Sequence, residues 1–368
     1  MPASSLGVLL KILIDKGYEV FGPTLEDQVI IYGPIRSVND LPKGWTDEQE
    51  KGRYRVRRRT DGAYFGYAVG AHSWKKYLQL PRRPIWRALK QDQNIEIVEA
   101  KEEPPKMAFL GVRSCELHAI TIQDRILAQG EWPNDGYRQR RERLFTVAVN
   151  CTSTAPTCFC TSMNTGPEVT LQSDLQMTEV IHAREHFFLI KSCTNIGDEI
   201  LQQLPVRKAS AGEQKLGRQG VKRAIEQMQS GPRHFDSSDL KELLYRNFES
   251  QSWDKVAERC LSCANCTMAC PTCFCSTVED TTDLSGEHAE RWERWDSCFT
   301  AGFSHLTGGS VRPDTRSRYR QWMTHKLATW HDQFDTSGCV GCGRCITWCP
   351  VGIDLTEEIR TIRNLEQP

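Results

Sequence analysis

Two stretches in the C-terminal part of the chain share one cysteine pattern: Cys260-Leu-Ser-Cys-Ala-Asn-Cys-Thr-Met-Ala-Cys-Pro271 and Cys339-Val-Gly-Cys-Gly-Arg-Cys-Ile-Thr-Trp-Cys-Pro350. Both follow the spacing C-x2-C-x2-C-x3-C-P, which is typical of bacterial ferredoxins with two [4Fe-4S] clusters. The short spacings let three thiolates of one loop reach three corners of a cubane, while the fourth points to the other cluster. The pattern therefore predicts a ferredoxin-like fold around these residues.

The crossed arrangement assigns each run's fourth cysteine to the other run's cluster. We expect one [4Fe-4S] cluster to be held by Cys260, Cys263, Cys266 and Cys349. The second [4Fe-4S] cluster is then held by Cys339, Cys342, Cys345 and Cys270. Two structural zinc sites are the alternative, but zinc sites use well-separated cysteine pairs rather than four cysteines within eleven residues.

A third group of cysteines lies in the N-terminal half. Cys151, Cys158 and Cys160 are too closely spaced for unrelated buried thiols, and Cys115 follows a short apolar segment that predicts a neighbouring strand. We expect these four residues to hold a third [4Fe-4S] cluster, with Cys193 as the competing fourth ligand. A zinc site and plain buried thiols are the alternatives.

Three cysteines near the ferredoxin-like runs remain: Cys273, Cys275 and Cys298. The first two belong to the pentapeptide Pro-Thr-Cys-Phe-Cys at 271–275, which repeats residues 156–160 of the N-terminal group. Because the neighbouring cluster already has four ligands, we expect these three thiols to be buried or adjacent to a cluster without binding iron.

Composition and charge limit the class of protein. The chain has 368 residues, enough for two or three domains, and its 47 basic side chains balance 47 acidic ones. It therefore lacks the basic excess of a nucleic-acid binder. No apolar run reaches the roughly 18 residues of a membrane span, and the N-terminus does not read as a secretory signal. We expect a cytoplasmic protein whose cysteines bind metal rather than form disulfides.

The hydrophobic pattern predicts an α+β protein. Leu6, Leu9, Leu10 and Leu13 lie on one face of an amphipathic N-terminal helix that Ser4 or Ser5 would cap. The apolar segments 107–113 and 145–151 are expected to be buried strands, with a helix at 115–129 between them. This order of elements is typical of an α/β domain.

The domain boundary is expected in the polar segment 205–236. We predict an N-terminal α/β domain over residues 1–235, which holds the third cluster site. Residues 236–368 would form the two-cluster ferredoxin-like domain, mainly helical and with a long insertion at about 276–335.

Two features are candidates for contact with partner proteins. The insertion carries an Arg-rich stretch and several tryptophans, for which we favour partner docking over a cap packed on the clusters: Trp292, Trp295, Trp322 and Trp330. The basic runs 53–59 and 138–143 would either dock an acidic partner or form a solvated face.

The cysteine framework resembles a known family. GVRSCELHAITIQDRIL (111–127) is similar to a segment of the iron–sulfur β subunits of sulfhydrogenases, which are NAD(P)-linked [NiFe] hydrogenases, and of the A subunit of anaerobic sulfite reductase. VNCTSTAPTCFCTSMNTGPE (149–168), WDSC (295–298) and the two ferredoxin-like runs complete the family's pattern in order. Cys193 lies outside that pattern.

The resemblance implies an electron-transfer subunit of a cytoplasmic [NiFe] hydrogenase linked to NAD(P), and it supports the third cluster. It also implies partners: a flavin- and NAD(P)-binding subunit and the small and large hydrogenase subunits. The chain itself shows no catalytic residues and neither a Rossmann nor a Walker motif. A subunit of anaerobic sulfite reductase and a free-standing redox or zinc-binding interaction protein are the alternative functions.

Overall fold

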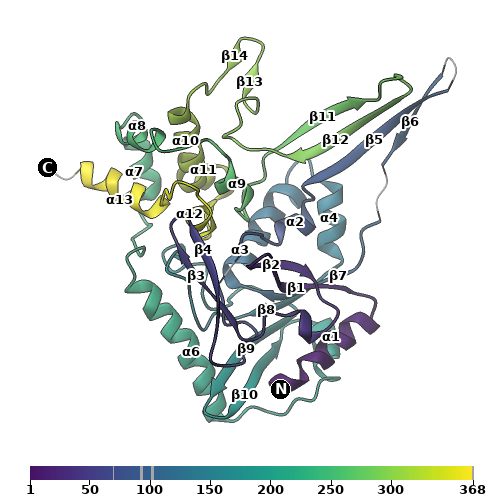
Figure 1. The fold of residues 1–368 in the computed structure, drawn as a ribbon, viewed down its shortest axis with the longest axis vertical. Coiled ribbons are helices and arrows are strands. Elements are labelled where there is room, and N and C mark those ends of the chain that lie inside the picture. The colour runs from purple at the N-terminus through teal and green to yellow at the C-terminus, as the bar shows by residue number, and fades with distance from the viewer. Residues whose placement is uncertain (69, 92–93, 101–102, 367–368) are drawn as a thin grey trace.

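The structure is a computed structural model that describes residues 1–68, 70–91, 94–100 and 103–366 (Figure 1). It contains both helices and sheets, in agreement with the predicted α+β class. The N-terminal half is built around a six-stranded sheet, and the cysteine-rich C-terminal part packs beside one edge of that sheet.

The central sheet has the strand order β10-β9-β8-β7-β1-β2. Its members are β1 (Glu19–Glu26), β2 (Val29–Pro34), β7 (Met107–Val112), β8 (Leu144–Val149), β9 (Leu175–His182) and β10 (Glu185–Ser192). The four inner strands are parallel, and hairpins add one antiparallel strand at each edge. The expected strands at 107–113 and 145–151 correspond to β7 and β8. Every residue of β7 is buried, because helices cover both faces of a parallel sheet.

Helices surround this sheet: α1 (Leu6–Asp15), α2 (Lys75–Leu78), α3 (Ser114–Gln123), α4 (Asp135–Glu142), α5 (Asn195–Leu201) and α6 (Ala211–Gln229). α1 buries the four leucines of the amphipathic pattern, although Ser5 at its N-cap forms no side-chain capping bond. α3 continues into a π-helical segment, Asp124–Ala128, so the helix expected at 115–129 is present. α6 occupies the polar segment for which we expected only a boundary. Its first turn is closed by reciprocal hydrogen bonds between Ser210 and Glu213.

Alternate residues of β7 face two separate cores. Ala108 and Leu110 pack with the leucines of α1, whereas Phe109 and Val112 pack with Leu117 of α3 and its neighbours. The sheet is therefore packed on both of its faces.

A second sheet joins distant parts of the chain. β5 (Arg82–Gln91) and β6 (Asn94–Glu99) pair with β11 (Ser276–Thr282) and β12 (His288–Trp295) in the order β11-β12-β5-β6. Figure 1 shows this sheet as an arm that projects away from the body of the molecule. Part of the predicted insertion is thus a hairpin that pairs with the N-terminal half, a connection that sequence patterns did not indicate.

The C-terminal part contains α7 (Leu240–Arg246), α8 (Ser252–Ala257), α9 (Asn265–Met268), α10 (Thr315–Thr324), α11 (Trp330–Phe334), α12 (Arg344–Thr347) and α13 (Leu355–Leu365), with a short hairpin of β13 (His305–Leu306) and β14 (Gly309–Ser310). Trp322 and Trp330 of the insertion are buried. For these two residues the favoured docking role is wrong, because they pack within the chain's own core and not on its surface.

A small hairpin of the N-terminal half lies against α12. It consists of β3 (Trp45–Glu50) and β4 (Arg53–Arg58). The N–H of Gly52, in its turn, donates to the Ile346 carbonyl at 3.1 Å. Among the described residues, no helix is long and apolar enough to cross a membrane.

Candidate metal centres

The two ferredoxin-like loops have the same backbone conformation. Ser262 and Gly341, each two residues after the first cysteine, have positive φ angles of 50° and 63°. Ala264 and Gly343, two residues further on, have φ angles of 65° and 77° and form the N-caps of α9 and α12. These left-handed residues curl each loop around its three cysteines, so the repeated spacing produces two copies of one cradle.

Backbone N–H groups in these loops point at cysteine sulfurs. Three such contacts are present: Ser262 N to Cys260 Sγ at 3.4 Å, Gly341 N to Cys339 Sγ at 3.4 Å, and Ile353 N to Cys349 Sγ at 3.3 Å. N–H···S hydrogen bonds stabilise the negative charge of metal-bound thiolates and tune cluster potentials. The donor chemistry and the loop geometry fit iron–sulfur clusters.

The structure brings the four cysteines of the first set together: Cys260, Cys263, Cys266 and Cys349. They surround a small cavity whose inner wall is formed by Phe299, Tyr319 and Trp322. Burial raises the pKa of the Cys266 thiol well above its ordinary value, and the nearby sulfurs add to this rise. Bound iron would have to displace these protons.

The cysteines of the second set are also neighbours: Cys339, Cys342, Cys345 and Cys270. Among the residues that the structure describes, no three ligating side chains meet around one point as they would for a single metal ion. Cys270 differs from the other three, because a hydrogen bond from Cys273 and the nearby Lys326 ammonium hold its pKa well below the ordinary value despite burial. Lys326 Nζ donates to Cys270 Sγ at 3.3 Å. Sequence reasoning missed this lysine, which lies 56 positions from its partner.

The N-terminal set is assembled at the carboxyl edge of the central sheet. Cys115 opens α3 directly after β7, and Cys151 follows β8, the parallel neighbour of β7. The carboxyl ends of adjacent parallel strands meet at one edge, so these two residues lie close together. The loop after β8 brings in Cys158 and Cys160. Burial raises the pKa values of Cys115 and Cys160 well above the ordinary range.

The N-terminal loop packs directly on the second ferredoxin-like loop. The Phe159 N–H donates to the Gly341 carbonyl at 2.8 Å. A Cβ atom on Gly341 would lie 2.6 Å from the Phe159 oxygen, and one on Gly343 would lie 2.3 Å from the Thr157 oxygen. Only glycine allows this approach. The N-terminal set of cysteines therefore adjoins Cys342 of the second set.

Cys193 lies near the amino-terminal ends of the parallel strands, whereas Cys115 and Cys151 lie at their carboxyl ends. It follows β10, whose last residue, Ser192, pairs with Leu175 at the start of β9. Its N–H donates to the Asp174 carbonyl at 3.1 Å. The candidate ligand Cys115 instead lies at the edge where the parallel strands end, which favours it over Cys193.

The three leftover cysteines lie close to the two ferredoxin-like sets. Cys273 donates to Cys270, and Cys298 lies beside Cys275 and near Cys266. Burial raises the pKa of Cys298 to about 12. These positions agree with the expectation of partly buried thiols next to the cluster sites.

A buried ion pair joins the second loop to the N-terminal half. Arg344 and Glu116 are 0% and 1% exposed, and their closest N–O distance is 2.6 Å. Arg344 also donates to the Gly70 and His72 carbonyls at 2.8 and 2.9 Å. Glu116 directly follows Cys115, so this contact fixes the third set against the second loop. Removing either partner would leave an uncompensated buried charge.

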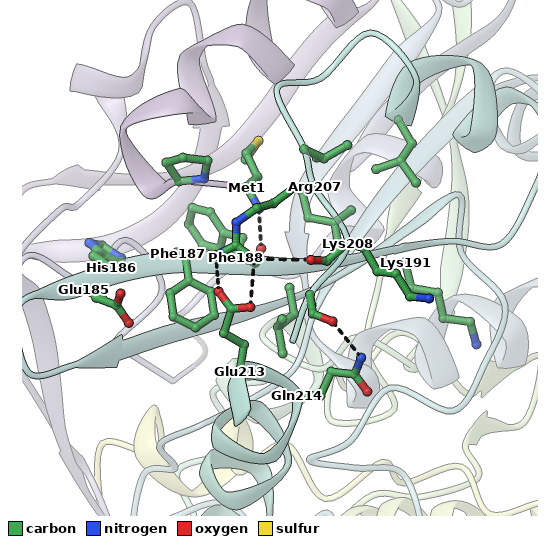
Figure 2. A pocket seen from close by; sticks show the side chains of 16 residues that line it. Met1, Glu185, His186, Phe187, Phe188, Lys191, Arg207, Lys208, Glu213 and Gln214 are labelled. Atoms are coloured by element: carbon green, nitrogen blue, oxygen red, sulfur yellow. Dashed lines mark hydrogen bonds and ion pairs between the residues drawn. The ribbon is translucent and has the colours of Figure 1, made fainter. Parts of the chain in front are cut away.

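A surface pocket of about 840 Å³ lies along the edge strand β10, and no cysteine lines it (Figure 2). The Met1 ammonium donates to the Phe188 carbonyl at 2.9 Å on one side of it, and Arg207 pairs with Glu213 at 2.6 Å on the other. Its lining shows no group suited to redox chemistry, so the candidate site remains the cysteine sets.

Comparisons with known proteins agree with this geometry. Residues 259–353 match the family described as the 4Fe-4S dicluster domain. The chain is 30% identical to subunit β of sulfhydrogenase 2 from Pyrococcus furiosus over 297 residues, which are 78% of this chain and 82% of that protein. No solved structure matches the chain. Both matches support an iron–sulfur electron-transfer subunit. The chain belongs to the family of sulfhydrogenase β subunits.

Proposed function

We propose that this chain carries three [4Fe-4S] clusters and relays electrons between other subunits of an NAD(P)-linked [NiFe] hydrogenase. Two clusters would be held by the crossed ferredoxin-like sets: Cys260, Cys263, Cys266 and Cys349, and Cys339, Cys342, Cys345 and Cys270. The third would be held by Cys115, Cys151, Cys158 and Cys160. When bound, each cluster takes up and releases one electron.

One observation carries this proposal: the contact between the N-terminal loop and the second ferredoxin-like loop. The bond from Phe159 to Gly341 supports a series in which the second set stands between the other two. Cys266 of the first set neighbours Cys345 of the second, and Cys342 of the second neighbours Cys160 of the third. Neighbouring sites in series are what a one-electron relay requires.

The chain's own residues would hold the clusters and exclude water from them. Cys339, Cys342 and Cys270 of the second set are 8–9% exposed, and Cys115 and Cys160 of the third are 6–7% exposed. Burial and the number of N–H···S donors are two of the levers by which a protein sets a cluster's reduction potential. These five cysteines are therefore shielded, whereas Cys151, Cys158 and Cys345 are half-buried. Electrons would enter or leave at less shielded points.

The hydrogenase partners are proposed from the family. The relative is by its name a sulfhydrogenase subunit, so we infer that this chain assembles with nickel–iron hydrogenase subunits and with a flavin-containing NAD(P)-binding subunit. Purification of the chain from its native source, without a tag, should yield a complex that contains nickel and flavin. A complex with sirohaem and without nickel would contradict this assignment.

Iron content tests the three-cluster proposal. We expect about twelve iron atoms and twelve acid-labile sulfides per chain in protein purified without oxygen. Cys158→Ser should lower the iron content to about eight, because the third set loses a ligand. Cys193→Ser is the matched control and should leave it at about twelve.

Two outcomes would contradict the proposal. About eight iron atoms in the unchanged protein would exclude a third [4Fe-4S] cluster. Stoichiometric zinc with little iron would exclude the relay altogether. Electron paramagnetic resonance of the remaining clusters shows whether Cys158→Ser is still folded, and Cys115→Ser provides a second variant of the same set.

A further inference from the structure

The first set of cysteines lies at the surface of the molecule. All sixteen cysteines belong to the described residues, and Cys263 alone among them is exposed. Two apolar side chains flank it, Leu261 at 64% and Val351 at 38% exposure. An exposed ligand inside an apolar rim is the geometry of a site that another protein can approach closely.

The hairpin of β3 and β4 is fixed beside this exposed loop. Tyr54 stacks on Trp348 with ring centroids 5.2 Å apart. A Cβ atom on Gly52 would lie 2.9 Å from the Cys349 oxygen, so the turn touches the backbone of a proposed ligand. The orientation of β4 relative to the first set is therefore determined by packing.

β4 brings positive charge to this face. Arg53 and Arg55 are exposed and line a surface pocket of about 660 Å³. Asn265, Cys349 and Pro350 border both this pocket and the cavity of the first set, so the two lie side by side.

Arg53 and Arg55 give the pocket lining a net positive charge, because Asp27 is the one carboxylate among its described residues. Glu50 and Glu48 stand opposite these two arginines on β3 but do not line the pocket. Two other arginines of β4 are engaged within the hairpin. Arg57 pairs with Glu48 at 2.6 Å, and Arg58 lies 3.9 Å from the centroid of the Trp45 ring.

We propose that this face, formed by Leu261, Cys263, Val351, Arg53 and Arg55, docks an acidic one-electron redox protein. We name it the Cys263 face. An apolar centre with a charged rim is the usual anatomy of a protein interface, and opposite charge steers the partner into place. The inference rests on the proposed function, since it assigns the first set as one end of the electron relay.

The transfer at this face is a single-electron step. The partner's cofactor is oxidised by one electron, and the centre held by the first set is reduced by one. No bond forms or breaks and no proton moves. Arg53 and Arg55 contribute only electrostatic attraction and hold no cluster, so variants at these two positions should change the rate of association and leave the centres intact.

The test uses the full chain with its iron and a reduced acidic flavodoxin as the probe. The second-order rate is followed by the bleaching of the iron–sulfur absorption in a stopped-flow instrument at several salt concentrations. The rate should fall as salt rises, because screening weakens attraction between opposite charges. Arg53→Glu together with Arg55→Glu should lower the rate at low salt on the order of tenfold and remove its salt dependence.

The second basic run provides the matched control. Arg138→Glu together with Arg143→Glu makes the same change in net charge on α4 and the turn after it, so the rate should change by less than about twofold. The proposal is overturned if the β4 variant matches the unchanged protein, if both double variants slow transfer equally, or if salt accelerates transfer. Iron content, measured on each sample, separates these results from a failure of the proposed function, in which the unchanged protein itself lacks the clusters.

Discussion

At the scale of single residues, Lys326 is the side chain with the clearest expected effect on electron transfer. Its Nζ donates to Cys270 Sγ, to Thr272 Oγ1 at 2.9 Å and to the Gly338 carbonyl at 2.8 Å. Burial alone would lower the pKa of Lys326, but the Cys270 and Cys273 sulfurs raise it well above the ordinary value. The ammonium therefore stays charged next to the second set.

Lys326→Met should make the reduction potential of the second cluster more negative. Reduction adds a negative charge, and the lost ammonium no longer stabilises it. A unit charge about 8 Å away in a medium of effective dielectric constant near 20 contributes about 2 kcal/mol, which corresponds to a shift on the order of 50–100 mV. The measurement is a redox titration followed by electron paramagnetic resonance.

Lys75→Met is the control for this prediction. Lys75 is also buried, but its Nζ donates to the Cys273 carbonyl at 2.9 Å and lies 3.8 Å from the centroid of the Trp295 ring. Because it donates to no proposed ligand sulfur, its loss should shift the potential less. An unchanged potential in Lys326→Met with full iron content would show that the lysine serves packing alone.

At the scale of elements, the loop 339–345 has two contacts that a free ferredoxin loop would not need. Arg344 of this loop forms the ion pair with Glu116 of α3. Gly341 and Gly343 lack a Cβ atom, which allows the backbone of residues 157–160 to pack against the loop. The loop is therefore both a cluster cradle and a joint between the two halves of the chain. Its stability and the iron content of the third set should change together.

Gly343→Ala should separate the two loops. Its Cβ atom would lie 2.3 Å from the Thr157 oxygen, and the residue has a φ of 77°. We expect a lower unfolding midpoint and loss of iron from the third set, measured by thermal unfolding and iron analysis. Gly17→Ala is the control: its φ is 82° but nothing lies within 4 Å of the new Cβ atom. It should cost only the left-handed strain of about 1–2 kcal/mol and no iron. Equal effects in both variants would contradict a specific loop contact.

At the scale of the whole molecule, strand pairing and an ion pair join residues before and after the expected boundary at residue 235. β5 pairs with β12 from Arg82 to Leu89, and Arg233 forms a buried ion pair with Asp354 at 2.7 Å. Because these contacts cross the boundary, the N-terminal half has buried groups that only the C-terminal half satisfies.

A chain that ends at residue 235 should therefore be less stable than the full chain. Glu116 would lose Arg344, which in buried pairs costs about 3–5 kcal/mol, and β5 would lose its partner strand. We expect a lower thermal midpoint and faster cleavage in limited proteolysis. A cooperative transition at the midpoint of the full chain would show instead that residues 1–235 fold independently.

Much of the fold was predictable from the sequence because its signals are local. The leucines of α1 repeat at helical spacing, and β7 and β8 are short apolar runs between polar segments. The arm was not predictable, because pairing of β5 with β12 depends on register between segments about 200 residues apart. The burial of Trp322 was also missed, because composition does not distinguish a core tryptophan from an interface anchor.

The sequence by itself determined the two ferredoxin-like cradles. Their geometry depends on residues within seven positions of each other, so the cysteine spacing suffices to predict them. Only the tertiary structure decided which distant groups meet there: Lys326 beside Cys270, and the basic strand beside Cys263. Those contacts depend on how whole elements pack, and packing is set by the shape of two cores that no single stretch of sequence contains.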